Sequence, residues 1–218
     1  MDAREALHRL ATRYRSLVRY RDNGEVMLYG AESGPTRSTF TTEFSRSIGL
    51  TFRFLHASYT IELVGTSQGA LVSSQGLSPA PTTLSDTILA AKGVTFTAAY
   101  LVPPMLLPGI LVGRTIADAS DPELKGKETI NGEPCFVIKL APGWADGEVL
   151  VSESSFALCL FRVRKLQFGR EMAERARLAG IYVEPRVTNA EFSLVVTYES
   201  ELEDGDDPPS TLDLGPEP

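Results

Sequence analysis

The first apolar pattern in the chain has the period of an α-helix. Apolar side chains fall on one face of a helix predicted over residues 4–21, at Leu7, Leu10, Tyr14, Leu17 and Val18. Asp2 is suited to cap this helix, and Asn23-Gly24 is suited to end it. Arginines fill the other face, so we expect a solvated surface there or, at most, peripheral contact with an anionic membrane.

After residue 23 the pattern changes to the two-residue alternation of half-buried β-strands. Alternating segments separated by short turns cover residues 24–30, 37–46, 50–57, 60–64, 70–74, 128–130, 135–140, 147–152, 156–166 and 191–199. Asn131-Gly132 between two of these segments is the strongest hairpin signal. Helices do not alternate with the strands, so the pattern predicts an antiparallel sheet and excludes a parallel one.

The centre of the chain interrupts the strands. Residues 84–92 are compatible with a helix, and residues 93–113 contain no charged side chain. This uncharged stretch is long enough to span a bilayer, but Pro103-Pro104 and Pro108-Gly109 break it. We therefore predict short helical turns packed on the sheet, not a membrane span. Residues 169–179 also favour a helix, and residues 201–218 are predicted to be a disordered acidic tail.

Composition and charge exclude several classes. The formal net charge is −7, and eight of the 28 acidic residues lie between residues 199 and 218, where there is no Lys or Arg. The rest of the chain is nearly neutral and has no basic stripe, which excludes a nucleic-acid partner. Cys135 and Cys159 fall on strands separated by another strand, so we expect two free thiols.

Candidate catalytic chemistry is confined to one motif. Gly65-Thr66-Ser67-Gln68-Gly69 matches the nucleophile elbow of serine hydrolases, which makes a Ser67 esterase a third hypothesis. However, the elbow belongs to a parallel sheet with its histidine after the serine, whereas His8 and His56 both precede Ser67. Neither histidine has a metal-ligand neighbour at a typical spacing. The sequence therefore predicts a hairpin turn at Ser67, no cofactor, no metal and no enzymatic activity.

A single antiparallel sheet of this size needs a cover on its concave face. We predict an α+β fold in which the N-terminal helix and residues 93–113 supply that cover. Any unfilled space would be an apolar hollow, and its predicted lining is Phe52, Phe54, Leu89, Phe96, Tyr100, Leu101, Met105 and Leu106. A fully packed core without a cavity is the alternative.

Several segments carry a family resemblance over residues 4–200. They are Ala6-Leu7-x-x-Leu10-x-x-x-Tyr14-Arg15-Ser16-Leu17-x-x-Tyr20, Asp22-x-Gly24-Glu25-Val26, residues 40–46 (FTTEFSR), residues 50–54 (LTFRF), Leu106-Leu107 and residues 131–136 (NGEPCF). The pattern resembles the bacterial lipoprotein-carrier superfamily (LolA/LolB-like), in particular an outer-membrane lipoprotein-sorting-like branch. The resemblance implies an unclosed β-barrel, or half-barrel, with helices as a lid over a bound acyl chain or lipidated partner.

The resemblance also implies a role for one arginine and a compartment. Arg46 occupies the place of the arginine that latches the lid in the carrier, although Ser47 follows it where the family has proline. We expect a periplasmic or extracytoplasmic protein. No signal peptide is visible after Met1, which leaves a cytoplasmic location or a trimmed export segment open.

Three hypotheses follow for a domain over residues 1–200 with a tail at 201–218. The first is a non-enzymatic module that binds a lipid, an acyl chain or an acylated protein. The second is a protein-interaction or envelope-sensor module with a packed core, because the same fold serves such sensors. The third is the Ser67 esterase.

Overall fold

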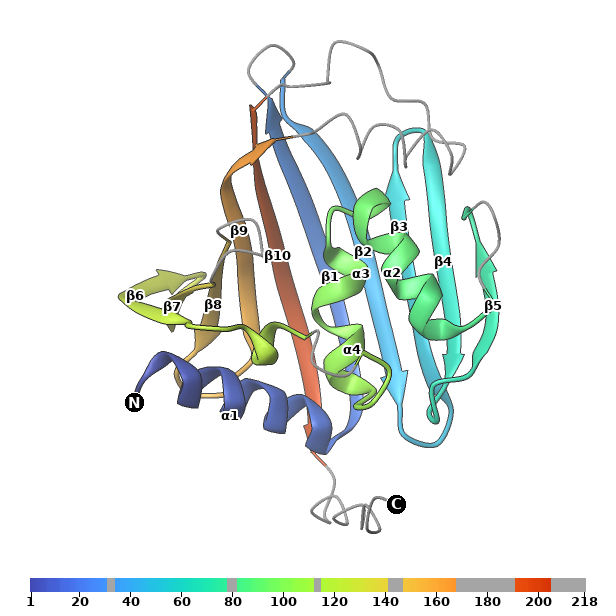
Figure 1. Cartoon of the computed structure of the whole chain (residues 1–218), viewed down its shortest axis with the longest axis horizontal. Helices are drawn as coiled ribbons and strands as arrows, with labels where there is room; N and C mark the ends of the chain where they lie inside the picture. The colour runs from blue at the N-terminus through green and yellow to red at the C-terminus, as the bar shows by residue number, and fades with distance from the viewer. Residues whose placement is uncertain (31–33, 78–81, 112–114, 141–146, 168–190, 205–218) are drawn as a thin grey trace.

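The computed structural model describes residues 1–30, 34–77, 82–111, 115–140, 147–167 and 191–204. Within these ranges ten strands form one antiparallel sheet in the order β5-β4-β3-β2-β1-β10-β9-β8-β7-β6 (Figure 1). The strands are β1 (Leu17–Gly30), β2 (Thr36–Ser45), β3 (Gly49–His56), β4 (Tyr59–Thr66), β5 (Leu71–Gln75), β6 (Glu123–Ile130), β7 (Glu133–Lys139), β8 (Glu148–Ser152), β9 (Leu158–Gln167) and β10 (Glu191–Asp204). Strands β5 and β6 are the two edges, so the described sheet is open. This architecture confirms the predicted fold class.

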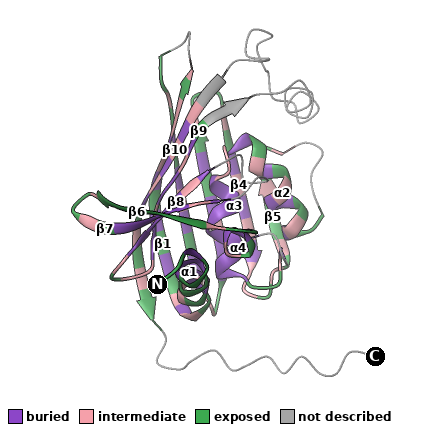
Figure 2. Cartoon of the chain, turned by 60° about the vertical axis from the view of Figure 1, so that its left-hand side comes forward, coloured by how far each residue is buried: buried purple, intermediate pink, exposed green. Residues whose placement is uncertain are grey.

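Helices cover one face of the sheet, which we call the inner face. They are α1 (Ala3–Ser16), α2 (Leu84–Val94), α3 (Ala98–Leu101) and α4 (Pro103–Leu106), followed by the 3-10 turn η1 (Ile116–Asp118). Figure 1 shows α2, α3 and α4 lying across the sheet, with α1 across one end of it. Figure 2 shows buried residues concentrated on the strands beneath these helices, whereas the edge strand β6 is exposed along most of its length.

Helix α1 forms on the predicted apolar stripe but ends earlier than predicted. The side chain of Asp2 accepts a hydrogen bond from Glu5 N (2.8 Å), as expected of its N-cap. The backbone becomes extended at Leu17, so the predictions of a helix to residue 21 and of a stop at Asn23-Gly24 are wrong. The physical reason is pairing: β1 runs between β2 and β10, and its backbone is hydrogen-bonded on both sides.

Gly24 has a packing role in the middle of β1. A Cβ atom placed there would lie 2.0 Å from Cζ of Phe40, the residue opposite it on β2. The absence of a side chain lets the Phe40 ring lie over the strand, where it meets Tyr198 of β10 edge-on with ring centroids 5.3 Å apart. The glycine that resembles a helix stop in the sequence therefore makes room for an aromatic side chain.

The hairpin and tail predictions have different outcomes. The hairpin at Asn131-Gly132 is confirmed, with positive φ angles of 51° and 86° between β6 and β7. Strand β10 continues through Asp204, where Arg13 of α1 forms an ion pair with it. The disorder predicted for residues 201–204 is therefore wrong. The remainder of that tail and the helix predicted at 169–179 lie outside the described residues.

The central segment is built from short helices, as predicted. The side chain of Thr83 caps α2. Pro103 and Pro104 occupy the first turn of α4, where backbone N–H groups have no partner within the helix, so the two prolines cost no helical hydrogen bond. Along the described ranges there is no helix with both the length and the apolar character needed to cross a membrane. We call residues 84–111 the lid.

The two thiols lie on the other side of the sheet, which we call the outer face. Cys135 and Cys159 are free, as predicted, and belong to a small apolar cluster with Val137, Leu150 and Leu160. Burial raises the pKa of Cys135 to about 12 and also raises that of Cys159. Both thiols are therefore protonated and unreactive at neutral pH.

Candidate functional site

The eight predicted ligand-binding residues come together beneath and within the lid. Phe52 and Phe54 point from β3 to the inner face and are fully buried. Tyr100, Leu101, Met105 and Leu106 are buried on α3 and α4, while Leu89 and Phe96 are half-buried and pack against the same cluster.

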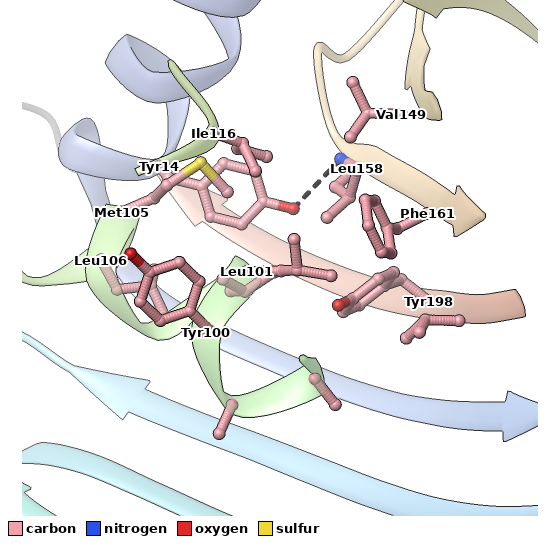
Figure 3. Close-up of a cluster of buried hydrophobic side chains, with 14 of the residues drawn as sticks. Tyr14, Tyr100, Leu101, Met105, Leu106, Ile116, Val149, Leu158, Phe161 and Tyr198 are labelled. Atoms are coloured by element: carbon pink, nitrogen blue, oxygen red, sulfur yellow. Dashed lines mark hydrogen bonds between the residues drawn. The ribbon is translucent and has the colours of Figure 1, made fainter. Parts of the chain in front are cut away.

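The interior is filled by the side chains of the lid. Figure 3 shows Leu101, Met105 and Leu106 directed into a cluster with Tyr14, Ile116, Phe161 and Tyr198. Leu101 and Leu106 have no exposed surface, and Met105 retains 2%. The apolar lid side chains thus fill the space for which the sequence left two alternatives, an apolar hollow or a fully packed core.

The junction between α2 and α3 is strained. Phe96 and Thr97 are consecutive non-glycine residues with φ angles of 48° and 71°, in the left-handed region. Such backbone costs about 1–3 kcal/mol per residue. The ring of Phe96 packs 6.4 Å from that of Phe54, and the hydroxyl of Tyr59 donates to the carbonyl of Val94 (2.7 Å). These contacts with β3 and β4 hold the strained junction in place.

A small pocket lies at the seam between α1 and the lid. Its volume is ≈ 150 Å³, and its wall includes Ala11, Arg15, Pro104, Met105, Pro108, Gly109, Leu111, Thr115 and Asp118. Met105 is thus a predicted ligand residue that also reaches a pocket. A larger groove of ≈ 400 Å³ lies around Arg19, Arg21, Glu43 and Ile48 at the end of β1 and β2, and is not lined by the lid.

Sequence reasoning missed a group of polar residues on the inner face. Asp22 of β1 is fully buried; its Oδ2 accepts a hydrogen bond from the hydroxyl of Tyr20 (2.7 Å), and its Oδ1 accepts one from Thr42 N (2.7 Å). Burial raises the pKa of Asp22 to about 6, although hydrogen bonds from the hydroxyl of Tyr20 and from the side chain and backbone of Thr42 act to lower it. Tyr20, Asp22 and Gly24 are alternate residues of β1 and therefore face the same side of the sheet. Assigning residues 17–24 to a strand would have placed Asp22 on the inner face from the sequence alone.

Tyr14 connects helix α1 to the far half of the sheet. Its hydroxyl oxygen accepts a hydrogen bond from the backbone N–H of Leu158 on β9 (3.1 Å), as Figure 3 shows. Its ring lies 5.3 Å from that of Tyr20. Burial raises the pKa of Tyr14 far above its usual range, so this hydroxyl stays neutral.

Arg46, the predicted lid latch, lies at the end of helix α1. Its Nε donates to the carbonyl of Leu17 (3.0 Å), its Nη2 donates to the carbonyl of Arg15, and its guanidinium lies over the ring of Phe44. These carbonyls belong to the last turn of α1 and the first residue of β1, where helical hydrogen bonds end. The helix that these contacts hold is therefore α1.

The geometry around Ser67 is that of a hairpin turn. Ser67 lies between β4 and β5, where Gly69 N donates to the carbonyl of Thr66 (3.0 Å). His56 lies at the opposite end of β4 from Ser67, stacked on Tyr59, and His8 is exposed on α1. Among the residues with described positions there is no cluster of His, Cys, Asp and Glu that fits a metal ion.

Among the comparisons with known proteins, only the one with solved structures found similar proteins. No protein-family model matches the sequence, and no curated protein does. Similar structures include MucB in the MucA/MucB complex of Pseudomonas aeruginosa (13% identity, 94% of this chain and 59% of that chain, TM-score 0.45). They also include a LolA superfamily protein from Nitrosomonas europaea (9% identity, 95% and 96% covered, TM-score 0.35). The lipoprotein LppX from Mycobacterium tuberculosis is a third (9% identity, 94% and 97% covered, TM-score 0.38).

The chain spans about three-fifths of the length of the MucB chains to which it is similar. A further similar structure is that of a domain from Vibrio parahaemolyticus named as an outer membrane lipoprotein-sorting protein domain (9% identity, 94% of each chain covered, TM-score 0.33).

Proposed function

We propose that this chain is a non-enzymatic, extracytoplasmic module that binds a lipid or acyl chain between the inner face of the sheet and the lid. The observation that carries the proposal is the construction of the lid. Its side chains fill an open, aromatic-lined sheet, yet it consists of short helices broken by prolines and joined through the strained Phe96-Thr97 junction. Such a cover can leave the sheet without unfolding a long helix.

A bound acyl chain can offset the cost of displacing part of the lid. Exposing three fully buried apolar lid side chains, such as Leu101, Met105 and Leu106, costs about 5–9 kcal/mol at about 1.5–3 kcal/mol each. An acyl chain that buries ten methylene groups in their place contributes about 8 kcal/mol. A chain of ordinary length can therefore offset the displacement of these three lid side chains.

The direct test is binding of a neutral apolar probe. N-phenyl-1-naphthylamine becomes strongly fluorescent in an apolar site, and 1-decanol should displace it. We expect saturable binding by the wild type and tighter binding by Leu101→Ala, because the truncated side chain no longer fills the site. Val72→Ala is the matched control, because Val72 is 63% exposed on the edge strand β5 and lines neither of the two pockets described above. Absence of saturable binding by the wild type and by Leu101→Ala would refute the proposal.

The packed interior favours a second candidate, a protein-interaction module in which the closed lid is the permanent state. In that case neither the probe nor 1-decanol binds, and Leu101→Ala loses stability without gaining affinity. The same titration therefore separates the two candidates.

A further inference from the structure

A polar stripe crosses the inner face beneath the helices. Thr42 of β2, Asp22 of β1 and Ser200 of β10 are paired across the three strands. Apolar and aromatic residues flank the stripe, with Phe44 and Tyr20 on one side and Phe40 and Tyr198 on the other. A buried carboxyl in such surroundings requires an explanation, because an isolated buried charge is costly.

Asp22 has hydrogen-bonding capacity to spare. An ionised carboxylate offers about four acceptor positions. The hydroxyl of Tyr20 and the backbone N–H of Thr42 use one on each oxygen. The carboxylate can therefore accept further hydrogen bonds on both oxygen atoms.

The arginines nearest to Asp22 in the sequence and the fold are directed elsewhere. Arg19 and Arg21 alternate with the inward residues of β1 and form ion pairs on the outer face. Arg46 binds the carbonyl groups at the end of α1. Across the described residues, the interactions found for Asp22 come from hydroxyl and backbone N–H groups and include no cation.

Two buried hydroxyl groups close to the stripe retain acceptor capacity. The Tyr198 hydroxyl makes no hydrogen bond with any described protein group, and the Thr42 hydroxyl makes none of good geometry, although it lies close enough to Asp22 to help stabilise the carboxylate. Thr42 is fully buried and paired directly with Asp22, while Tyr198 is 7% exposed and two residues before Ser200 on β10. Figure 3 shows Tyr198 beside Leu101 of the lid. Unpaired buried hydroxyls are uncommon, because each forfeits a hydrogen bond to water.

We propose that Asp22, Thr42 and Tyr198 form a subsite for the protonated primary amine of an apolar ligand, and this inference rests on the proposed function. A primary ammonium carries three N–H donors. The subsite offers three matching acceptors, namely the Asp22 carboxylate and the hydroxyl oxygens of Thr42 and Tyr198, since a hydroxyl that donates a hydrogen bond can still accept one. The ammonium supplies the cation that Asp22 lacks, and the ligand's chain lies against the flanking aromatic residues in place of the lid side chains.

The alternatives fit this arrangement less well. A ligand carboxylate or phosphate would place a second negative charge beside Asp22. A hydroxyl head provides one donor and leaves the remaining acceptors and the charge of Asp22 without a partner. The chemistry of the stripe thus selects an alkylammonium head over an anionic or neutral head.

The test compares three decyl ligands in displacement of N-phenyl-1-naphthylamine near neutral pH. Decylamine, 1-decanol and decanoate share a chain and differ in the head group. We expect decylamine to bind the wild type about tenfold more tightly than 1-decanol, as charge-assisted hydrogen bonds imply, with decanoate weakest. In Asp22→Asn this preference should disappear, and in Thr42→Val and Tyr198→Phe it should fall by a few-fold.

Glu25→Gln is the matched control, because it removes a carboxylate that pairs with Arg37 on the outer face, lines neither pocket and leaves the subsite intact. It should retain the wild-type preference. An unchanged preference for decylamine in Asp22→Asn would overturn the inference, as would equal binding of the three ligands by the wild type, and both results would leave the proposed function standing. If none of the three ligands displaces the probe and the probe itself does not bind, the proposed function fails.

Discussion

Replacing Asp22 by Asn should raise the stability of the protein, relative to the wild type, as the pH increases from about 4.5 to about 8. In the folded protein, burial raises the pKa of Asp22 from its usual 3.8 to about 6. The folded state therefore holds a proton at pH values where the unfolded chain has released it. Stability falls as pH rises through this window, and above pH 6 the full cost of the buried charge is present. Asn carries no charge in either state and escapes this cost.

The magnitude follows from the two pKa values. A difference of about two pH units corresponds to about 3 kcal/mol over the whole window, at about 1.4 kcal/mol per unit. Between about pH 4.5 and about pH 8, about 2 kcal/mol of it is expressed. For a chain of this size, that amount shifts Tm by about 4–8 °C.

The assay is urea unfolding of the wild type and of Asp22→Asn, followed by far-ultraviolet circular dichroism at both pH values without ligand. The free energy of unfolding of the variant, relative to the wild type, should rise by about 2 kcal/mol from the lower to the higher pH. The contributions of other titrating groups are the same in both proteins, so they cancel in this difference. Effects of the amide on the Tyr20 and Thr42 hydrogen bonds do not depend on pH, so they cancel between the two pH values. A relative stability that does not change with pH would refute the reasoning.

Three further substitutions test the packing of the fold. Gly24→Ala should cost about 1–3 kcal/mol of stability in urea unfolding, because its Cβ would overlap the Phe40 ring, whereas Gly34→Ala, with open space around it, should change little. Leu101→Ala should cost about 2–5 kcal/mol in the ligand-free protein, and a value near zero would show that the lid does not pack as described. Arg46→Gln should lower the free energy of unfolding by about 1–3 kcal/mol, because the carbonyl groups at the C-terminal end of α1 lose their charged donor. Amide hydrogen exchange in α1 should become faster, and an unchanged exchange rate would contradict this role of Arg46.

The elements that the sequence predicted well are those with strong local signals. The Asn131-Gly132 hairpin depends on positive φ angles that these two residues adopt readily between two paired antiparallel strands. The short helices of the lid follow from Pro103-Pro104, because proline fixes its own φ and cannot donate a hydrogen bond. Such signals act within a few residues, so a single sequence reveals them.

The part of the site built from apolar side chains was also predictable, because apolar residues on the strands and the lid must share an interior. Phe52 and Leu101 illustrate this, since both are fully buried in one cluster. The polar part was not predictable. Asp22 appeared to lie at the end of a helix, and only the assignment of residues 17–24 to β1 places it on the inner face.

The sequence by itself determined the α+β composition, the antiparallel character of the sheet and the break in the uncharged segment, because these follow from periodicity and from proline. Tertiary structure decided where α1 ends, because residues 17–22 fit a helix or a strand until β2 and β10 pair on either side of them. It also decided that the lid side chains fill the interior and that Asp22 lies beneath the helices. Those outcomes depend on contacts between segments more than a hundred residues apart, such as Tyr14 with Leu158, which no local pattern encodes.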